Sequence, residues 1–193
     1  VAQRALELRE EGMGLNDMAV LYRSHFHALE LQLEFTRRNI PFSITSGLRF
    51  FEQAHIKDVT SYLKWLANPR DEQAFKRLVL MLPGVGGKTA FKLWGQFLAA
   101  HTDTTPQAET LQKCAAVPKK AKVPWAQFSA TVSQLEIEPV AGDAGQMIEL
   151  IVDAGYSDYV EASYDRAPQR LDDIEQLGVF ARQYEALETF LAE

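Results

Sequence analysis

The chain has 193 residues, of which 47% are hydrophobic and 24% are charged, a composition typical of globular protein rather than of a disordered segment. No apolar run approaches the roughly 18 residues that a membrane span needs, and the first residues lack a signal-peptide pattern. We therefore expect a soluble, cytoplasmic protein with no membrane partner. The single cysteine, Cys114, excludes an internal disulfide, and no Cys or His cluster has the spacing of a metal site.

Charge is distributed unevenly along the chain, although the formal net charge is only −6. Counting Lys and Arg against Asp and Glu gives +1 for residues 1–70, +4 for residues 71–123 and −11 for residues 124–193. DNA phosphates require a basic surface, so any DNA contact is expected in the first two segments. Solvated helix faces alone would also explain such a gradient.

The first 69 residues predict a short α/β region. Residues 19–22 form a short, apolar, uncharged run typical of a buried parallel strand, and the apolar residues from Ala28 onward recur at helical spacing. After a break at Asn39-Ile-Pro41, residues 42–45 predict a second strand, which makes a β-α-β crossover. Such a small parallel sheet is either completed by chain not present here or is a remnant packed against helices.

After Gly47 the strand signals fade, and the sequence predicts helices. A first helix ends at Asn68-Pro69, and further helices are expected over 71–80, 88–100, 106–116, 124–135, 143–154 and from 168 to the C-terminus. Asp71 and Asp143 are the expected N-caps, Pro168 suits a first helical turn, and the Pro- and Lys-rich residues 117–124 predict a loop. The expected fold class is mainly α, with a short α/β portion followed by an all-helical domain.

Residues 82–90, called the glycine turn below, join two of these predicted helices. Gly84 and Gly86 permit close approach to the backbone, and Val85 is expected to plug between the helices. Unpaired amides at the start of the next helix, with the helix dipole, would bind one phosphate oxygen. The pattern therefore predicts a helix–hairpin–helix that binds DNA backbone without sequence preference. The predicted contacts are Gly84, Val85, Gly86, Gly87, Lys88 and Thr89.

Several other interpretations share parts of this pattern. Gly87-Lys88-Thr89 is similar to the end of a Walker A loop, but position 82 is Leu where that loop needs glycine. The turn also resembles that of helix–hairpin–helix DNA glycosylases, in which the lysine matching Lys88 can be a Schiff-base nucleophile. Such an enzyme needs an aspartate further on, and the nearest acid is Asp103. A glycosylase and a non-enzymatic DNA or protein interaction module, the latter suggested by the acidic final third, stay as alternatives, as does a turn with no ligand.

An ordered series of motifs accompanies the glycine turn. These are Ala19-Val-Leu-Tyr-Arg-Ser24, Gly47-Leu-Arg-Phe-Phe-Glu52, Ile56-Lys-Asp58 and Tyr62-Leu-Lys-Trp-Leu-Ala-Asn68. The series resembles the UvrD/Rep-type superfamily 1 DNA helicases, in which a Gly-Ile-Gly hairpin follows in the inserted helical domain 2B. The resemblance implies a partial RecA-like domain 2A over residues 1–69 and domain 2B over residues 70–193, with the DNA-binding hairpin at 82–90. His25 departs from the Asn that family members usually carry.

The resemblance also implies how the parent enzyme works. ATP and Mg²⁺ bind to motifs that these residues do not contain, so no cofactor is expected here and the chain alone is predicted to be inactive. Arg23, Ser24 and Arg49 are the implied single-strand contacts at the 2A edge, and the glycine turn would grip duplex DNA ahead of the junction. The implied partners are junction DNA, the rest of the helicase chain, and repair or replication proteins in a bacterial nucleoid.

Overall fold

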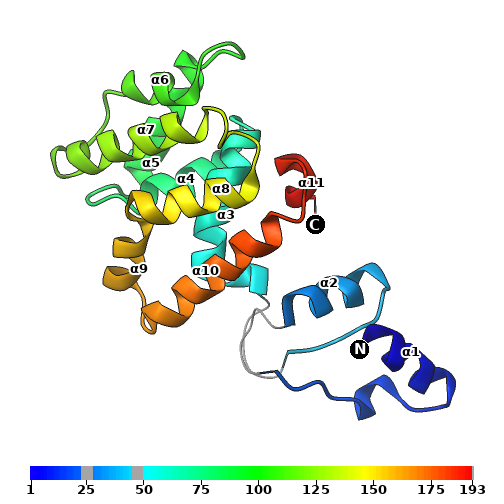
Figure 1. Ribbon diagram of the computed structural model, residues 1–193. Helices are drawn as coiled ribbons and strands as arrows, with labels where there is room; N and C mark the ends of the chain where they lie inside the picture. Colours follow the sequence, from blue (N-terminus) through cyan, green and yellow to red (C-terminus); the bar gives the residue numbers. More distant parts are fainter. Residues whose placement is uncertain (23–27, 45–49, 193) are drawn as a thin grey trace. The chain divides into compact units, whose positions relative to one another are not determined.

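The computed structural model describes residues 1–22, 28–44 and 50–192 (Figure 1). These residues are mainly helical, and no strand occurs among them. Contacts divide the chain into two compact units, Val1–Gln53 and Ala54–Glu193, and each is described by itself. None of the helices in the described ranges combines the length and the apolar character needed to cross a membrane.

The first unit contains two short helices, α1 (Ala2–Glu10) and α2 (Leu29–Arg37), together with the 3-10 turns η1 (Leu15–Asp17) and η3 (Phe50–Glu52). Helix α2 confirms the helix predicted from the apolar spacing after Ala28, because it buries Leu29 and Leu33 on one face. Its Phe35 packs edge-to-face on Phe42 with ring centroids 5.7 Å apart.

The two predicted strands are not confirmed. Residues 19–22 and 42–44 are extended or irregular without strand pairing, and position 45 lies outside the described residues. A strand exists only where a neighbouring backbone completes its hydrogen-bond ladder, and the described part of this unit supplies no such neighbour. Leu21 illustrates the consequence, since its side chain is 95% exposed where a buried strand was expected.

The helices of the second unit in the described ranges are α3 (Ala54–Ala67), α4 (Glu72–Leu80), α5 (Gly87–Ala100), α6 (Gln107–Gln112), α7 (Lys122–Leu135), α8 (Ala144–Ile151), α9 (Ser157–Ser163), α10 (Ala167–Ala181) and α11 (Leu187–Leu191). The unit is built around α3, which contacts α4, α8, α10 and α11 (Figure 1). On one side α4 packs on α5, and α5 and α7 contact α6; on the other side α8 packs on α10. Helix α3 therefore belongs with the helical unit, although the predicted domain boundary at residue 69 lies after it.

Helix starts follow the predicted caps. The carboxylate of Asp71 accepts a hydrogen bond from the backbone N–H of Ala74 at 2.9 Å, and that of Asp143 accepts one from Gln146 at 2.9 Å. The backbone hydrogen bond from Gln146 holds the pKa of Asp143 below its ordinary value. Pro168 lies in the first turn of α10, as its fixed backbone angle predicts.

Helix ends depart from the prediction in three places. Helix α6 stops at Gln112 rather than near 116, and the predicted loop at 117–124 contains the 3-10 turn η4 (Lys119–Ala121) and the start of α7. The helix predicted to reach 154 changes into the π-helical segment η5 (Val152–Tyr156), where Gly155 takes a φ of 116°. The C-terminal helix ends at Ala181, before the separate helix α11.

An aromatic cluster fixes α3, α4 and α5 against one another. Trp65 of α3 lies 5.4 Å from Phe75 of α4 and 5.1 Å from Phe97 of α5, between ring centroids, and Phe75 and Phe97 lie 5.4 Å apart. All three side chains are fully buried. Because each ring touches both others, the angle between α4 and α5 is set by packing, and so is the position of the turn that joins them.

The buried carboxylate of Asp58 links α3 by hydrogen bonds to α4 and to the segment from Val152 to Tyr164. Asp58 accepts hydrogen bonds from Arg77 Nε at 2.7 Å, from the Tyr156 hydroxyl at 2.8 Å and from the Tyr164 hydroxyl at 2.6 Å. Burial, and then the Asp58 charge, raise the pKa of Tyr156 well above its ordinary value. Three donors satisfy the carboxylate, which is what a charge in this position requires.

His55, also on α3, links this helix to α10 by hydrogen bonds. Its Nδ1 accepts a hydrogen bond from Arg170 at 2.8 Å, and its Nε2 lies 3.3 Å from the Asp173 carboxylate. Since a guanidinium only donates, Nδ1 carries no proton and Nε2 is the donor to Asp173. The side chain of Asp173 is buried against α3.

Close packing of α8 on α10 gives a stability test. A methyl group on Gly145 would overlap the Cγ of Arg182 and lie 3.1 Å from the carbonyl oxygen of Gly178. We expect Gly145→Ala to lower the free energy of unfolding by about 1–3 kcal/mol in urea denaturation, because the helices must move apart. Gly95→Ala is the matched control, since nothing lies within 4 Å of its added methyl group. It should raise the free energy of unfolding by about 0.5–1 kcal/mol, and equal effects for the two variants would contradict the packing argument.

Candidate nucleic-acid interface

The glycine turn follows the end of α4, and successive i to i+3 backbone hydrogen bonds form it. The N–H of Leu82 donates to the carbonyl of Val79 at 3.1 Å, and the N–H of Val85 donates to that of Leu82 at 3.2 Å. Between them Gly84 has a φ of +75°, in the left-handed region that side-chain-bearing residues avoid. Glycine is therefore required at position 84 by the conformation of the turn itself.

The two sides of the glycine turn differ in exposure. Val85 and Ala90 are 7% and 1% exposed and belong to the same core cluster as Trp65 and Phe75. Gly84, Gly86, Gly87 and Lys88 are exposed, as is Pro83. The turn is thus held from behind by apolar packing while its front faces solvent, as the sequence predicted for Val85.

Helix α5 starts at Gly87 without a side-chain cap, and Gly86 precedes it in an extended conformation. The first backbone hydrogen bond of the helix runs from the N–H of Ala90 to the carbonyl of Gly86 at 2.9 Å. The N–H groups of Gly87, Lys88 and Thr89 therefore precede the helical ladder. A methyl group on Gly86 or on Gly87 would meet nothing within 4 Å, so the space beside these amides is open to a ligand.

The structure brings six of the predicted contact residues together and does not describe the other three. Gly84, Val85, Gly86, Gly87, Lys88 and Thr89 form one continuous turn between α4 and α5. Val85 faces the core, so its side chain supports the turn and only its backbone is near the open face. Arg23, Ser24 and Arg49 lie outside the described residues.

The glycine turn does not have the features of a nucleotide-binding loop. It follows helix α4, whereas a Walker A loop follows a buried strand, and Leu82 occupies the position of the first glycine. In the described ranges no group of three or more His, Cys, Asp or Glu side chains could hold a metal ion. The glycine turn therefore does not fit a Walker A loop.

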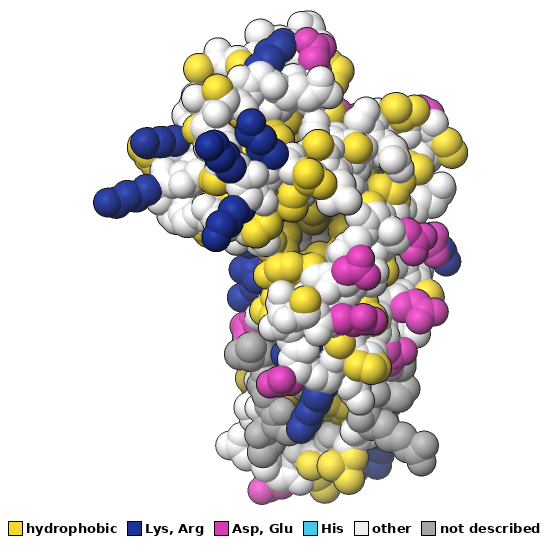
Figure 2. Space-filling model, turned by 90° about the vertical axis from the view of Figure 1, so that its left-hand side faces the viewer, with side chains coloured by type: hydrophobic (Ala, Val, Ile, Leu, Met, Phe, Trp, Pro, Cys, Tyr) yellow, Lys and Arg dark blue, Asp and Glu magenta, His cyan; other side chains and the backbone are white. Residues whose placement is uncertain are grey.

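A second loop, which the sequence did not connect with the turn, lies directly beside it. A methyl group on Gly84 would lie 3.6 Å from Cβ of Lys120 and 4.0 Å from Cβ of Pro118. Lys119, Lys120 and Lys122 are all exposed. Figure 2 shows Lys and Arg side chains gathered on one part of the surface, with most of the Asp and Glu side chains in view elsewhere. The Pro118-Lys-Lys sequence indicates a basic loop, but no local pattern in it predicts contact with Gly84.

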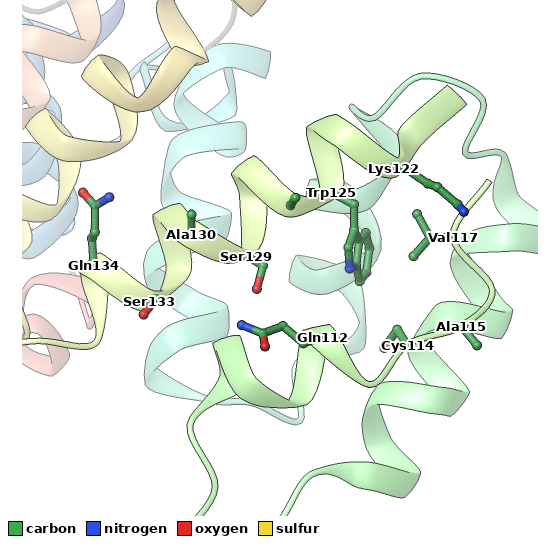
Figure 3. A pocket seen from close by; sticks show the side chains of 11 residues that line it. Gln112, Cys114, Ala115, Val117, Lys122, Trp125, Ser129, Ala130, Ser133 and Gln134 are labelled. Atoms are coloured by element: carbon green, nitrogen blue, oxygen red, sulfur yellow. The ribbon is translucent and has the colours of Figure 1, made fainter. Parts of the chain in front are cut away.

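A cavity of about 860 Å³ lies between α6 and α7 (Figure 3). Gln112 of α6 and Ser129 of α7 face each other across it, and Lys122 lies at one end. Cys114 also lines it, and burial raises the pKa of this thiol to about 11. Neither Lys88 nor any carboxylate lines this cavity.

The positions of Lys88 and Asp103 bear on the glycosylase alternative. Lys88 is exposed at the start of α5, whereas Asp103 follows its end and pairs with Arg70 at 3.6 Å. A helix of this length spans about 20 Å, so the amine and the carboxylate do not form one active site. Asp103 is therefore not positioned to act with a nucleophilic Lys88.

Comparison with known proteins shows the family of the chain. The model of the UvrD-like helicase C-terminal domain matches residues 1–101, more than half of the chain. The chain belongs to the UvrD-like helicase family. This match includes the glycine turn and all of α5.

Curated relatives of this UvrD-like chain are bacterial DNA helicases. DNA helicase II of Escherichia coli (strain K12) is 27% identical over 193 residues, covering 95% of this chain and 26% of the relative. The ATP-dependent DNA helicase UvrD1 of Mycobacterium leprae is 31% identical over 182 residues, which cover 88% of this chain and 22% of the relative. The ATP-dependent DNA helicase Rep of Buchnera aphidicola subsp. Schizaphis graminum is 37% identical over 73 residues, which cover 38% of this chain and 11% of the relative. The chain thus spans about a quarter of the length of the first two.

The conformation of the turn gives a second stability test. Gly84→Ala should lower the free energy of unfolding by about 1–2 kcal/mol, because alanine is strained at a φ of +75°. Gly86→Ala should lower it by less, about 0.5 kcal/mol, because Gly86 is extended and its Cβ meets no atom within 4 Å, so that only the poorer N-cap preference of alanine remains. Urea denaturation of both variants measures the difference, and an equal loss at the two positions would contradict the described turn.

Proposed function

We propose that this chain is the duplex-holding part of an ATP-dependent DNA helicase of the UvrD/Rep type, acting in DNA unwinding during repair or replication. The observation that carries the proposal is the glycine turn, whose back is fixed in the core and whose open face presents the first amides of α5. Family membership and the helicase names of the relatives support the same assignment.

In this proposal α4, the glycine turn and α5 act as a helix–hairpin–helix. The N–H groups of Gly87, Lys88 and Thr89 donate hydrogen bonds to oxygens of a backbone phosphate, and the positive end of the α5 dipole favours its charge. The ammonium group of Lys88 adds a salt-sensitive attraction. Because these groups reach phosphates and not base edges, binding is independent of base sequence.

The rest of the chain takes its role from the same family assignment. We infer that residues 1–69 are part of the RecA-like domain 2A and residues 70–193 are domain 2B. Arg23, Ser24 and Arg49 are proposed to contact single-stranded DNA at the 2A edge. ATP and Mg²⁺ are proposed to bind parts of the helicase that these 193 residues do not contain, so the chain alone should not hydrolyse ATP or unwind DNA. We propose that the parent enzyme acts in the bacterial cytoplasm.

Fluorescence anisotropy of a labelled forked DNA tests the role of the glycine turn. The Gly86→Ala, Lys88→Ala double variant should bind about tenfold or more weakly, because it crowds the amides and removes one charge, a loss of about 1.4 kcal/mol or more. Gly86→Ala should leave the fold intact, since its Cβ meets no neighbouring atom within 4 Å.

Gly95→Ala is the control for the added methyl group, because it makes a Gly→Ala change within α5, away from the turn. It should bind as the unmodified chain does. Equal affinity of the double variant and the control would contradict the proposed function.

A further inference from the structure

We propose that Lys119, Lys120 and Lys122, together called the lysine loop, form a second contact for duplex DNA phosphates, beside the glycine turn. This inference rests on the proposed function of the turn. Both segments would bind the DNA backbone: the glycine turn through its amides, and the lysine loop through most of the positive charge.

Direct packing holds the lysine loop against the turn. Ala121, at the centre of the loop, is fully buried in the same core cluster as Val85 and Ala90. The nearest approach is between Gly84 and Lys120, where a methyl group on the glycine would lie 3.6 Å from the lysine Cβ. The bases of these lysine side chains are thus positioned by the same core that positions the turn.

Polar contacts fix the chain that leads into the lysine loop. Gln96 of α5 accepts a hydrogen bond from the backbone N–H of Ala116 at 2.9 Å. At the other end the indole N–H of Trp125, in α7, donates to the carbonyl of Leu111 at 3.2 Å. The backbone of the loop is therefore held at both ends to α5 and α6, so it needs little ordering on binding.

Charge around the two segments is almost entirely positive. Residues 81–100 and 110–135 contain six lysines and no Asp or Glu. The two carboxylates between these ranges are already paired, Asp103 with Arg70 at 3.6 Å and Glu109 with Lys113 at 2.8 Å. Within the described part of the chain Lys88, Lys119 and Lys120 form no ion pair, so their charges are available to an external anion.

A nucleic-acid backbone fits this surface better than a single small anion does. The lysines are exposed and spread along a loop, which suits a row of phosphates more than one enclosed ion. The adjacent turn offers amides at a helix start, the other usual donor to DNA phosphates. A lysine ammonium group is a point charge on a flexible stem, which suits phosphate contacts that do not depend on base sequence.

The salt dependence of DNA binding tests the lysine loop. For the unmodified chain and the Lys119→Ala, Lys120→Ala variant, the association constant is measured by anisotropy at several KCl concentrations, on two forked duplexes of unrelated sequence. The variant should bind both duplexes about tenfold or more weakly, and its slope of log K against log salt should be smaller by about 2, since each lost phosphate contact removes about 0.9.

A matched control separates local contact from net charge. Lys57→Ala, Lys64→Ala removes the same charge from exposed positions on α3 and should keep the original slope and affinity. Lys119→Arg, Lys120→Arg should restore the slope, because it restores the charge. An unchanged slope in the alanine variant, or an equal change in the α3 control, would overturn the inference.

The outcomes also distinguish this inference from the proposed function. If Gly86→Ala, Lys88→Ala binds normally while the lysine-loop variant binds weakly, the lysine loop stands and the role of the glycine turn fails. If the turn variant binds weakly while the lysine-loop variant binds normally, the reverse holds. If the unmodified chain binds neither duplex at low salt, both are overturned.

Discussion

The features of the candidate interface depend on one constraint, the burial of Val85 and Ala90 behind an exposed glycine turn. Apolar packing on the inner side fixes the start of α5, where Gly86, Gly87 and Lys88 are exposed and no side chain caps the first amides. A phosphate site made of amides works only if the backbone is held in place before the ligand arrives. In this chain the core supplies that rigidity, and glycine at positions 84, 86 and 87 supplies the open face.

The surrounding unit extends the same rigidity. The rings of Trp65, Phe75 and Phe97 hold α3, α4 and α5 together on the side of the turn. On the other side the Asp58 carboxylate joins α3 and α4 to the tyrosines of the segment from Val152 to Tyr164. The three rings thus fix α4 relative to α5, and with them the position of the turn that joins these helices.

Much of the helical unit could be predicted from local sequence signals, because caps and apolar spacing act over a few residues. Asp71 and Asp143 cap the helices that they were expected to cap, and residues 82–90 form a turn between two helices. Contacts between distant segments could not be predicted this way: Lys120 beside Gly84 follows from the packing of η4 against the core, which no local pattern encodes. The strands at 19–22 and 42–45 were inferred from apolar runs, yet a strand depends on a pairing partner that the sequence of this unit does not identify.

The most direct test of the account is to observe which backbone amides respond to DNA. In ¹⁵N–¹H correlation spectra of the chain titrated with a short DNA duplex, the amides of Gly87, Lys88 and Thr89 should shift most, because they are the proposed phosphate donors. The amides of Lys119 and Lys120 should shift with them at the same DNA concentrations. Shifts confined to the acidic helices α8–α10, with the amides of the glycine turn unchanged at saturation, would contradict the account.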